Sequence, residues 1–422
     1  MRIAIIGAGI SGLTAAFLLQ HDHDLTIYEA ADWIGGHSHT VEVPDLDARG
    51  KPRSVPIDTG FIVFNEWTYP NFCKLLARLG VESIPSDMSF SVRDNRDGLE
   101  YAGTSLNSLF AQRANLFRPS FWRMLRDIPR FFDQARRIAA APPAESEGLT
   151  VGALLREGRF SREFIEQHLT PMGAAIWSAE TGAFGDYPMY FLARFMKNHG
   201  MLNILDRPIW RTIRGGSREY VAALTAGFRD RIRLSTPVRA VRRIADRVEI
   251  ATDHGPTESY EAVILAVHSD IALRILTDAG PAEQAVLGAI RYQPNDVVLH
   301  TDITRLPNLR RAWASWNYRI EADESATARL TYNMNMLQRL TTREVHCVSL
   351  NQTEHIAPNR ILGRYDYDHP QYTLESQRAQ QRLAEVSGRN RTFYCGAYWG
   401  FGFHEDGVKS GLAVAKYFGK QL

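Results

Sequence analysis

The sequence is poor in cysteine and has no long apolar run. Its 422 residues include three cysteines, Cys73, Cys347 and Cys395, whose spacing matches no metal site. An odd number of scattered thiols is typical of a reducing compartment, so we expect reduced cysteines and a cytoplasmic protein. No apolar run is long enough to cross a bilayer. Because the first strand pattern begins directly after Met1, we expect no signal peptide.

An excess of charge is lacking as well. The chain has 49 lysines and arginines against 47 acidic residues, a formal charge of +2, which does not favour nucleic acid as a partner. Only six of those 49 residues are lysines, and none lies between Lys197 and Lys409. The hydrophobic content of 45% supports a sizeable core, and the length allows two or three domains.

The first 29 residues have the pattern of a dinucleotide-binding unit. Residues 3–6 are typical of a buried parallel strand, and Gly7, Gly9 and Gly12 follow with G-x-G-x-x-G spacing. Gly7 would allow a tight turn, Gly9 the approach of a pyrophosphate to the backbone, and Gly12 close packing of the next helix. The following strand ends at Glu29, placed to bind ribose hydroxyls and to repel a 2′-phosphate. The pattern therefore disfavours NADP.

Two more glycine-rich segments follow Glu29. Gly35 and Gly36 would allow close backbone approach, and the hydroxyl and imidazole groups of residues 37–40 can donate to phosphate or ribose. Residues 58–60, with the sequence DTG, would leave room for a large planar ring. Near the C-terminus, residues 392–418 predict a strand, a glycine-rich turn and a helix from about Val408. The N-terminus of that helix would stabilise the negative charge of a reduced flavin.

These segments together resemble the superfamily of FAD-containing amine oxidases and phytoene desaturases, over nearly the whole chain. A closer resemblance is to a bacterial branch often found beside cyclopropane-fatty-acid-synthase-like methyltransferases. It is carried by DTGFIVFNEWTYPNF, AWASWNY, VSLNQTEHI and YCGAYWGFGFHEDGVKSG. The resemblance implies an α/β fold, with a Rossmann-type FAD-binding domain of the glutathione-reductase-like type and an interleaved α+β substrate domain.

The cofactor implied is FAD, held without a covalent bond because no histidine or cysteine lies in an evident flavin-linkage motif. Val238 matches the family position whose backbone contacts the adenine side of FAD. The FAD-binding domain is expected over residues 1–68, 208–270 and 385–422, and the substrate domain over 69–207 and 271–384. The residues expected to bind FAD are Gly7, Gly9, Ile10, Ser11, Gly12, Glu29, Gly35, Gly36, His37, Thr40, Thr59, Gly60, Val238, Gly396, Glu405, Asp406, Gly407 and Val408.

Residues 106–141 alternate aromatic rings with arginines. Two interpretations stay open: an amphipathic region lying in a membrane interface, or helices with core aromatics and solvated arginines. The rings are Phe110, Phe117, Phe121, Trp122, Phe131 and Phe132, and the arginines are Arg113, Arg118, Arg123, Arg126, Arg130, Arg136 and Arg137.

Catalytic residues are less evident than cofactor residues. The H-x-H pairs at 21–23 and 37–39 lack further ligands, so no metal site is predicted. His300, Tyr318 and His404 are candidates for proton transfer. Many amine oxidases of the superfamily hold a lysine through water at flavin N5, and the absence of lysine between Lys197 and Lys409 weakens amine oxidation. The aromatic and amide side chains at positions 313 and 316–318 are expected to wall a flat apolar slot.

The resemblance implies an FAD-dependent oxidoreductase that desaturates or saturates C–C bonds in methylated or unsaturated acyl chains of membrane phospholipids. A methyltransferase of the cyclopropane-synthase type would be its partner, and the inner face of the membrane its place of action. A flavin amine oxidase, a carotenoid-type desaturase or isomerase, and a flavoprotein scaffold for the methyltransferase are the alternatives. The sequence leaves the oligomeric state open, with a homo-oligomer among the outcomes.

Overall fold

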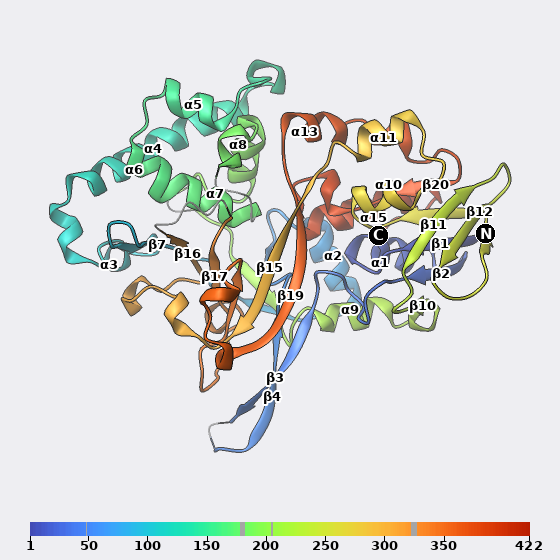
Figure 1. The fold of residues 1–422 in the computed structure, drawn as a ribbon, viewed down its shortest axis with the longest axis horizontal. Helices are drawn as coiled ribbons and strands as arrows, with labels where there is room; N and C mark the ends of the chain where they lie inside the picture. The colour runs from blue at the N-terminus through green and yellow to red at the C-terminus, as the bar shows by residue number, and fades with distance from the viewer. Residues whose placement is uncertain (48, 178–181, 204–205, 322–326) are drawn as a thin grey trace.

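The computed structural model describes residues 1–47, 49–177, 182–203, 206–321 and 327–422. Its first sheet has five parallel strands in the order β10-β2-β1-β14-β20 and lies at the right of Figure 1. Their apolar runs are buried on both faces, as is usual for parallel strands. The strands are β1 (Arg2–Ile6), β2 (Asp24–Tyr28), β10 (Ile232–Arg233), β14 (Ala262–Leu265) and β20 (Thr392–Tyr394).

Helices cover both faces of this sheet. Alternate side chains such as Ile5 and Ile6 enter different cores, because successive residues of a strand point to opposite faces. One core is formed with α1 (Ile10–Leu19), α2 (Pro70–Leu79), α9 (Arg218–Thr225) and α15 (His404–Tyr417). The other is formed with α10 (Ser269–Ile275), α11 (Pro281–Leu287), α13 (Leu374–Gln380), α14 (Leu383–Val386) and the sheet of β11 (Val238–Arg243), β12 (Val248–Thr252) and β13 (Glu258–Tyr260).

Three of these helices lie in stretches that the sequence assigned to the substrate domain. They are α2, α11 and α13, and their apolar side chains pack against the five-stranded sheet. Phe72 and Leu75 of α2 are fully buried in the same core as α1. Short amphipathic helices carry no sign of which sheet they will cover, so sequence patterning alone could not place them.

The second large sheet is mixed, with seven strands in the order β19-β15-β18-β17-β16-β7-β8. Neighbouring strands are antiparallel except β16 and β7, which are parallel. The strands are β7 (Phe90–Asp94), β8 (Leu99–Ala102), β15 (Tyr292–His300), β16 (Trp316–Ile320), β17 (Leu330–Asn333), β18 (Cys347–Leu350) and β19 (Ile361–Pro370).

Two small sheets lie between the large ones. The first is the hairpin of β3 (Thr40–Leu46) and β4 (Pro52–Asp58), which projects downward in Figure 1. The second has three short strands: β5 (Phe64–Asn65), β6 (Ser83–Pro85) and β9 (Trp210–Ile213).

A lobe of helices stands against the seven-stranded sheet, at the upper left of Figure 1. Its longest member, α4, buries Phe121, Phe131 and Phe132 against neighbouring helices. Among the described residues, no helix is both long and apolar enough to span a membrane. The helices are α3 (Leu106–Leu109), α4 (Pro119–Ala140), α5 (Val151–Glu157), α6 (Arg162–Phe164), α7 (Thr170–Trp177) and α8 (Met189–Asn198).

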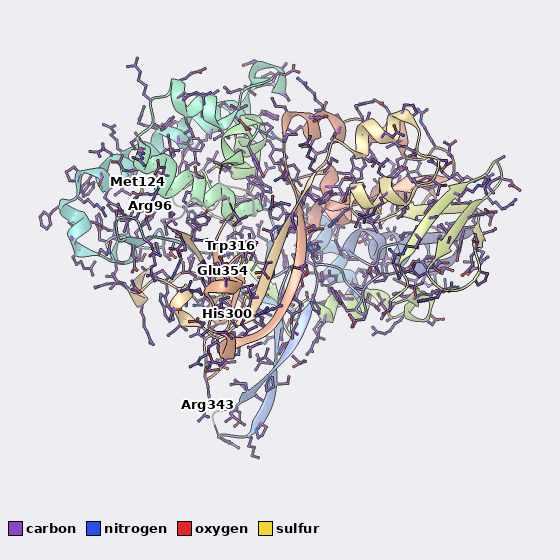
Figure 2. The ribbon with its side chains drawn as sticks, in the orientation of Figure 1. Arg96, Met124, His300, Trp316, Arg343 and Glu354 are labelled. Atoms are coloured by element: carbon purple, nitrogen blue, oxygen red, sulfur yellow. The ribbon has the colours of Figure 1, made fainter. Side chains whose placement is uncertain are left out.

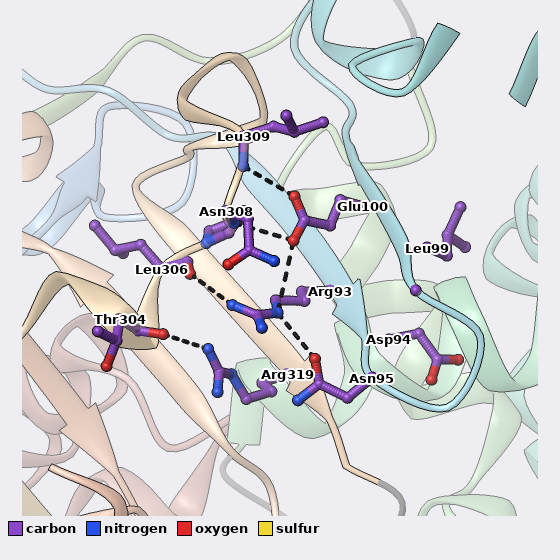
Figure 3. A network of polar contacts seen from close by, with 12 residues as sticks. Arg93, Asp94, Asn95, Leu99, Glu100, Thr304, Leu306, Asn308, Leu309 and Arg319 are labelled. Carbon is purple, nitrogen blue, oxygen red and sulfur yellow. Dashed lines mark hydrogen bonds and ion pairs between the residues drawn. The ribbon is translucent and has the colours of Figure 1, made fainter. Parts of the chain in front are cut away.

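A polar network on the outer face of the seven-stranded sheet fastens the segment that follows β15 (Figure 3). Arg93 of β7 and Arg319 of β16 stand opposite each other in register. Arg93 donates to the Leu306 carbonyl at 3.3 Å, and Arg319 donates to the Thr304 carbonyl. Glu100 pairs with Arg93 at 3.6 Å and accepts from the backbone N–H groups of residues 308 and 309. The network fixes residues 304–309 over the far side of the sheet.

Candidate cofactor site

The glycine turn after β1 has one open position. A Cβ on Gly7, whose φ is +105°, would lie 2.5 Å from the Ala266 carbonyl oxygen, and a Cβ on Gly12 would lie 2.2 Å from the Gly7 oxygen. In the part of the chain that the structure describes, no heavy atom lies within 4 Å of a Cβ built on Gly9. Gly9 is the N-cap of α1, which begins at Ile10 and Ser11 without a side-chain cap. The backbone N–H groups of this first turn therefore face free space suited to an anion.

Glu29 lies directly beside that turn. Its Oε2 accepts a hydrogen bond from the Ala8 N–H at 2.8 Å, and its Oε1 accepts one from the Ala31 N–H at 2.9 Å. The two bonds fix the carboxylate at the end of β2. Each carboxylate oxygen can accept a further bond, so the group keeps capacity for sugar hydroxyls.

The second glycine segment closes over the first. The Gly35 N–H donates to the Ala8 carbonyl at 2.9 Å, and Gly35 also forms an isolated bridge with Gly9. A Cβ on Gly36 would lie 3.2 Å from the Gly9 Cα, and one on Gly60 would lie 2.3 Å from the His37 oxygen. The three glycine-rich segments that the sequence analysis singled out in the first 60 residues are therefore in direct contact.

Three histidines gather beside this junction. The His37 ring centre lies 6.1 Å from that of His268, 5.6 Å from that of His369 and 4.9 Å from that of Tyr367. His268 is stacked on Tyr292 at 4.4 Å. Burial lowers the pKa of His37 well below its usual range and lowers the pKa of His369 to about 4, so both rings are neutral.

Two of these imidazoles have unused hydrogen-bonding capacity. Within the described part of the chain, His37 Nε2 and His268 Nδ1 are buried and have no hydrogen-bond partner. A buried polar atom without a partner costs about 1–3 kcal/mol, so such atoms usually mark the place of a ligand or an ordered water. Together with the open position at Gly9 and the uncapped α1, they fit a dinucleotide that brings its own polar groups.

The side chains of other predicted FAD ligands are hydrogen-bonded within the protein itself. The Thr40 hydroxyl donates to Asp58 Oδ1 at 2.6 Å, and Asp58 also accepts from the Ser217 N–H at 2.9 Å and from Gln338 Nε2 at 3.1 Å. Burial raises the pKa of Asp58 to about 6. The Thr59 hydroxyl lies 2.8 Å from the Tyr367 hydroxyl. Thr40 is therefore bonded within the β3–β4 hairpin, and Thr59 connects the end of β4 to Tyr367 of β19.

His404 is held in the same way. Its Nε2 lies 2.8 Å from the Ser38 hydroxyl and 3.0 Å from the Tyr220 hydroxyl, and its ring is stacked 3.5 Å from that of Phe61. Burial lowers the pKa of His404 to about 3, so the ring is neutral. The geometry gives His404 the role of a structural residue under the glycine segments.

The start of α15 contacts three other parts of the chain. Glu405 accepts from the Asn71 side chain at 2.6 Å and from the Phe72 N–H at 2.9 Å, and so caps the N-terminus of α2. A Cβ on Gly407 would lie 2.6 Å from Ile10 Cγ2, so this glycine permits the close contact of α15 with α1. The side chain of Val408 is fully buried in that core. The sequence analysis missed both contacts, although the G-x-x-x-G spacing of Gly407 and Gly411 was a signal for close helix packing.

Asp406, Gly396 and Val238 complete the predicted set. Asp406 Oδ2 accepts from the N–H groups of Phe401 at 3.0 Å and Phe403 at 3.2 Å, and burial raises its pKa to about 6. The Gly396 N–H donates to the Ser410 hydroxyl at 2.9 Å. Val238 begins β11, next to an irregularity in the pairing with β12. Asp406 and Glu405 thus both accept hydrogen bonds from the protein itself.

The catalytic candidates of the seven-stranded sheet lie on opposite faces. His300 is buried, with Nε2 2.8 Å from the Ser349 hydroxyl and Nδ1 accepting from the Asp302 N–H at 3.1 Å. Ser349 reaches Thr331 at 2.7 Å, and Thr331 stands opposite Asn317. Since side chains alternate along a strand, the neighbouring residue Tyr318 points to the other face. The structure therefore does not bring His300 and Tyr318 together.

The expected apolar slot forms only in part. Trp316 and Tyr318 share the face of β16 that meets α7, where the Trp316 ring lies 5.0 Å from that of Tyr332 (Figure 2 labels Trp316 and His300). Asn317 points to the opposite face, and Trp313 donates to the Pro307 carbonyl at 2.7 Å in the segment beyond it. Two of the four residues expected in the slot are thus placed elsewhere.

The comparisons with known proteins agree with this geometry. The family described as flavin containing amine oxidoreductase matches residues 10–302. The amine oxidase [flavin-containing] A of Canis lupus familiaris is 21% identical over 285 residues, which are 65% of this chain and 50% of that protein. Pseudooxynicotine dehydrogenase of Pseudomonas sp is 25% identical over 281 residues, 62% of this chain and 50% of that protein. The chain spans about half the length of these curated relatives.

Solved structures resemble the whole fold. Putrescine oxidase bound to putrescine has a TM-score of 0.68 at 16% identity, with 99% of each chain covered. The CLA-producing fatty acid isomerase from P. acnes has the same TM-score and identity, with 99% of this chain and 98% of that chain covered. The predicted superfamily, the mixed α/β fold and FAD are confirmed. The chain belongs to the flavin containing amine oxidoreductase family.

Proposed function

We propose that this flavoprotein desaturates or saturates C–C bonds in methylated or unsaturated acyl chains of membrane phospholipids. A methyltransferase of the cyclopropane-fatty-acid-synthase type, which modifies the same chains, is its proposed partner. The observation that supports an acyl substrate best is the apolar character of the sheet face that meets α7. Its strands β16, β17 and β18 present Trp316, Tyr318, Leu330, Tyr332, Val348 and Leu350, all of them aromatic or aliphatic.

An apolar wall suits an alkyl chain better than a cationic amine. Burying an alkyl chain contributes about 0.8 kcal/mol per CH₂ group, whereas an ammonium group needs an acceptor or a counter-charge. The fold shared with a fatty acid isomerase supports an acyl substrate for this architecture. The sequence also lacks lysine between Lys197 and Lys409.

In this mechanism, bound FAD supplies two-electron chemistry at a C–H bond. The protein positions the acyl chain along Trp316 and Tyr332 and keeps water from the reacting carbons. One proton must be held or moved for each turnover, and a neutral imidazole can do either. His37 and His268 are candidates for this task, because each is a neutral imidazole with a buried ring nitrogen that has no hydrogen-bond partner among the described residues.

A second candidate function is amine oxidation. The canine amine oxidase and the putrescine oxidase found by the comparisons favour it by their names. The two functions differ in what reduces the flavin, so one experiment separates them.

The test uses the FAD-loaded protein without oxygen. Phospholipids from cells with and without the methyltransferase are added, and the visible flavin absorbance is followed. Bleaching of oxidised flavin by methylated lipid supports desaturation, and reoxidation of chemically reduced flavin by unsaturated lipid supports saturation. Putrescine is the comparison substrate. Amine-dependent bleaching without any response to lipid would overturn the proposal in favour of amine oxidation.

A matched pair of tryptophans sharpens the test. Trp316→Ala should lower the rate of the lipid-dependent flavin change at least about tenfold, the effect expected for losing one large apolar contact. Trp313→Ala should leave the rate within about twofold, because Trp313 contacts Pro307 beyond the other face. FAD content is measured in both variants. Equal losses in the two variants would show that the proposed acyl wall is in the wrong place.

A further inference from the structure

The tip of the helical lobe exposes large apolar side chains. Phe117 is 87% exposed, Leu106 76%, Trp122 49% and Leu116 43%. All four lie within residues 106–122, and we call them the tip patch. Single exposed apolar residues are ordinary, but a group of four marks an interaction surface.

The segments that carry the tip patch are held together. Trp122 Nε1 donates to the Leu116 carbonyl at 2.9 Å, and the Trp122 ring lies 5.7 Å from that of Phe110. Arg113 donates to the Asn107 side chain at 2.6 Å and so joins the start of α3 to the turn that carries Leu116. The patch is therefore a built surface, and its neighbours Phe121 and Met124 are buried beneath it in the lobe core.

The segment that carries the tip patch has charged side chains of one sign only. Residues 106–126 contain four arginines and no lysine, aspartate or glutamate, so their formal charge is +4. Arg126 has 69% of its side chain accessible, with Asp127 3.7 Å away. Arg118 and Arg123 pair with Asp97 and Glu163 from other segments. Within the described residues, the hydrogen-bond acceptors of Arg113 are the Phe110 carbonyl and the Asn107 side-chain oxygen.

We infer that the tip patch docks on an anionic phospholipid bilayer. Phe117, Trp122, Leu106 and Leu116 enter the boundary between headgroups and acyl chains, while Arg113 and Arg126 contact lipid phosphates. An aromatic and aliphatic surface flanked by exposed arginines matches that boundary in both polarity and charge. Docking rests on the proposed function only in that it would bring the lipid substrate to the enzyme.

The position of the patch fits this role. Figure 1 places α3 at the end of the molecule farthest from β1 and β2. The apolar cluster that contains Phe121 continues through Phe195 and is packed by Phe403, which directly precedes α15. Apolar side chains thus extend from the tip patch to the cofactor-binding end of the lobe.

The experiment is co-sedimentation of the FAD-loaded full chain with vesicles of phosphatidylcholine containing one third phosphatidylglycerol. The double variant F117S/W122S should lower the bound fraction at least about tenfold, because two large rings no longer leave water. Its control is I209S, since Ile209 is 71% exposed on a different part of the surface. Phe117 and Ile209 are largely exposed, whereas W122S also removes the bond to the Leu116 carbonyl, so the denaturant midpoint of each variant is measured and binding is compared at equal concentrations of folded protein.

The arginines are tested separately. Binding should weaken as salt screens the charges, and R113Q/R126Q should lower the bound fraction further than R239Q, whose side chain is 65% exposed near the five-stranded sheet. Salt-independent binding, or equal losses in I209S and F117S/W122S, would overturn the docking surface. So would a wild-type dimer that F117S/W122S converts to a monomer, because the patch would then be a contact between copies.

Docking and turnover fail in different ways. If docking holds, F117S/W122S should act on detergent-dispersed methylated phospholipid at the wild-type rate and lose activity only on vesicles. If the wild type binds vesicles but no lipid changes its flavin, the proposed substrate is wrong and the docking surface stands. If dispersed lipid changes the flavin while wild-type protein ignores vesicles, the docking surface is wrong.

Discussion

The polar groups around the candidate cofactor site form two regions. They differ in how many of their polar atoms are hydrogen-bonded to the protein. On the open side, Gly9 faces free space and two imidazole nitrogens, His37 Nε2 and His268 Nδ1, have no partner among the described residues. On the closed side, Asp58 and His404 use their polar atoms on hydroxyl, amide and backbone groups of neighbouring elements.

Both regions gave the same signal in the sequence, namely polar residues beside glycines. The difference teaches that such residues serve two purposes in this fold. Some are kept free for the cofactor, and others join the segments that surround it. Thr40, Glu405 and Asp406 belong to the second group through their side chains. Substitutions should therefore separate loss of FAD from loss of stability.

The largest effect is expected at the two glycines of the opening turn. Gly12→Val should prevent folding or cost more than about 4 kcal/mol, because its Cβ would lie 2.2 Å from the Gly7 oxygen. Gly9→Val should fold but purify without the yellow colour of FAD, because the side chain fills the space left for the pyrophosphate. Urea unfolding and the flavin-to-protein ratio check the pair. A Gly9→Val protein with stoichiometric FAD would show that the open side is not the pyrophosphate site.

A smaller contrast is expected between two histidines. His404→Ala should destabilise the protein without FAD by about 3 kcal/mol, since it removes two hydrogen bonds and a stacked ring. His37→Ala should change that stability by less than about 1 kcal/mol and weaken FAD binding about tenfold, the scale of one hydrogen bond. Chemical denaturation and FAD titration measure the two effects. The comparison between the regions fails if the two variants are equally destabilised.

The pH dependence of stability gives the most specific effect, because it reports on one carboxyl group. Burial raises the pKa of Asp406 from 3.8 to about 6, so the folded protein holds this proton more tightly than the unfolded chain. The resulting stabilisation is complete below about pH 4 and is lost as the pH rises through 6, about 3 kcal/mol in total. Asp406→Asn removes this contribution. The difference in unfolding free energy between wild type and variant should change by that amount from pH 4 to pH 7, and a constant difference would contradict the assignment.

The first 60 residues show what the sequence could predict. The opening strand and the roles of Gly7 and Gly12 follow from local spacing, because a strand-turn-helix unit is specified by neighbouring residues. The contact between the three glycine-rich segments joins separate parts of the chain and was not predicted. The capping of α2 by Glu405 joins residues far apart in the chain, and no local pattern encodes it. The face of the sheet that a side chain of β16 occupies depends on strand register, so Asn317 was assigned to a slot that it does not line. Trp313 was assigned to the same slot, but it lies before β16 and donates to the Pro307 carbonyl.

The region at 106–141 shows why composition alone left two interpretations. The aromatic rings of this region fit both interpretations. Phe121, Phe131 and Phe132 of α4 are buried in the lobe, whereas Trp122 of α4 and Phe117, which precedes the helix, are exposed. The periodicity of the helix determines this division. The sequence could not show which arginines at 113–126 are paired and which are free to meet lipid, because their ion-pair partners come from other segments.

The contact of α15 with α1 also has a consequence for biosynthesis. At ribosomal speeds of about 5–20 residues per second, α15 is made roughly 20–80 seconds after α1. Gly407 and Gly411 bring α15 within van der Waals distance of Ile10 and Thr14 of α1. Until α15 has been made, this side of α1 lacks that contact. The nascent chain therefore exposes part of its future core throughout translation. FAD capture should follow release from the ribosome, and chaperone binding should be strongest before that point.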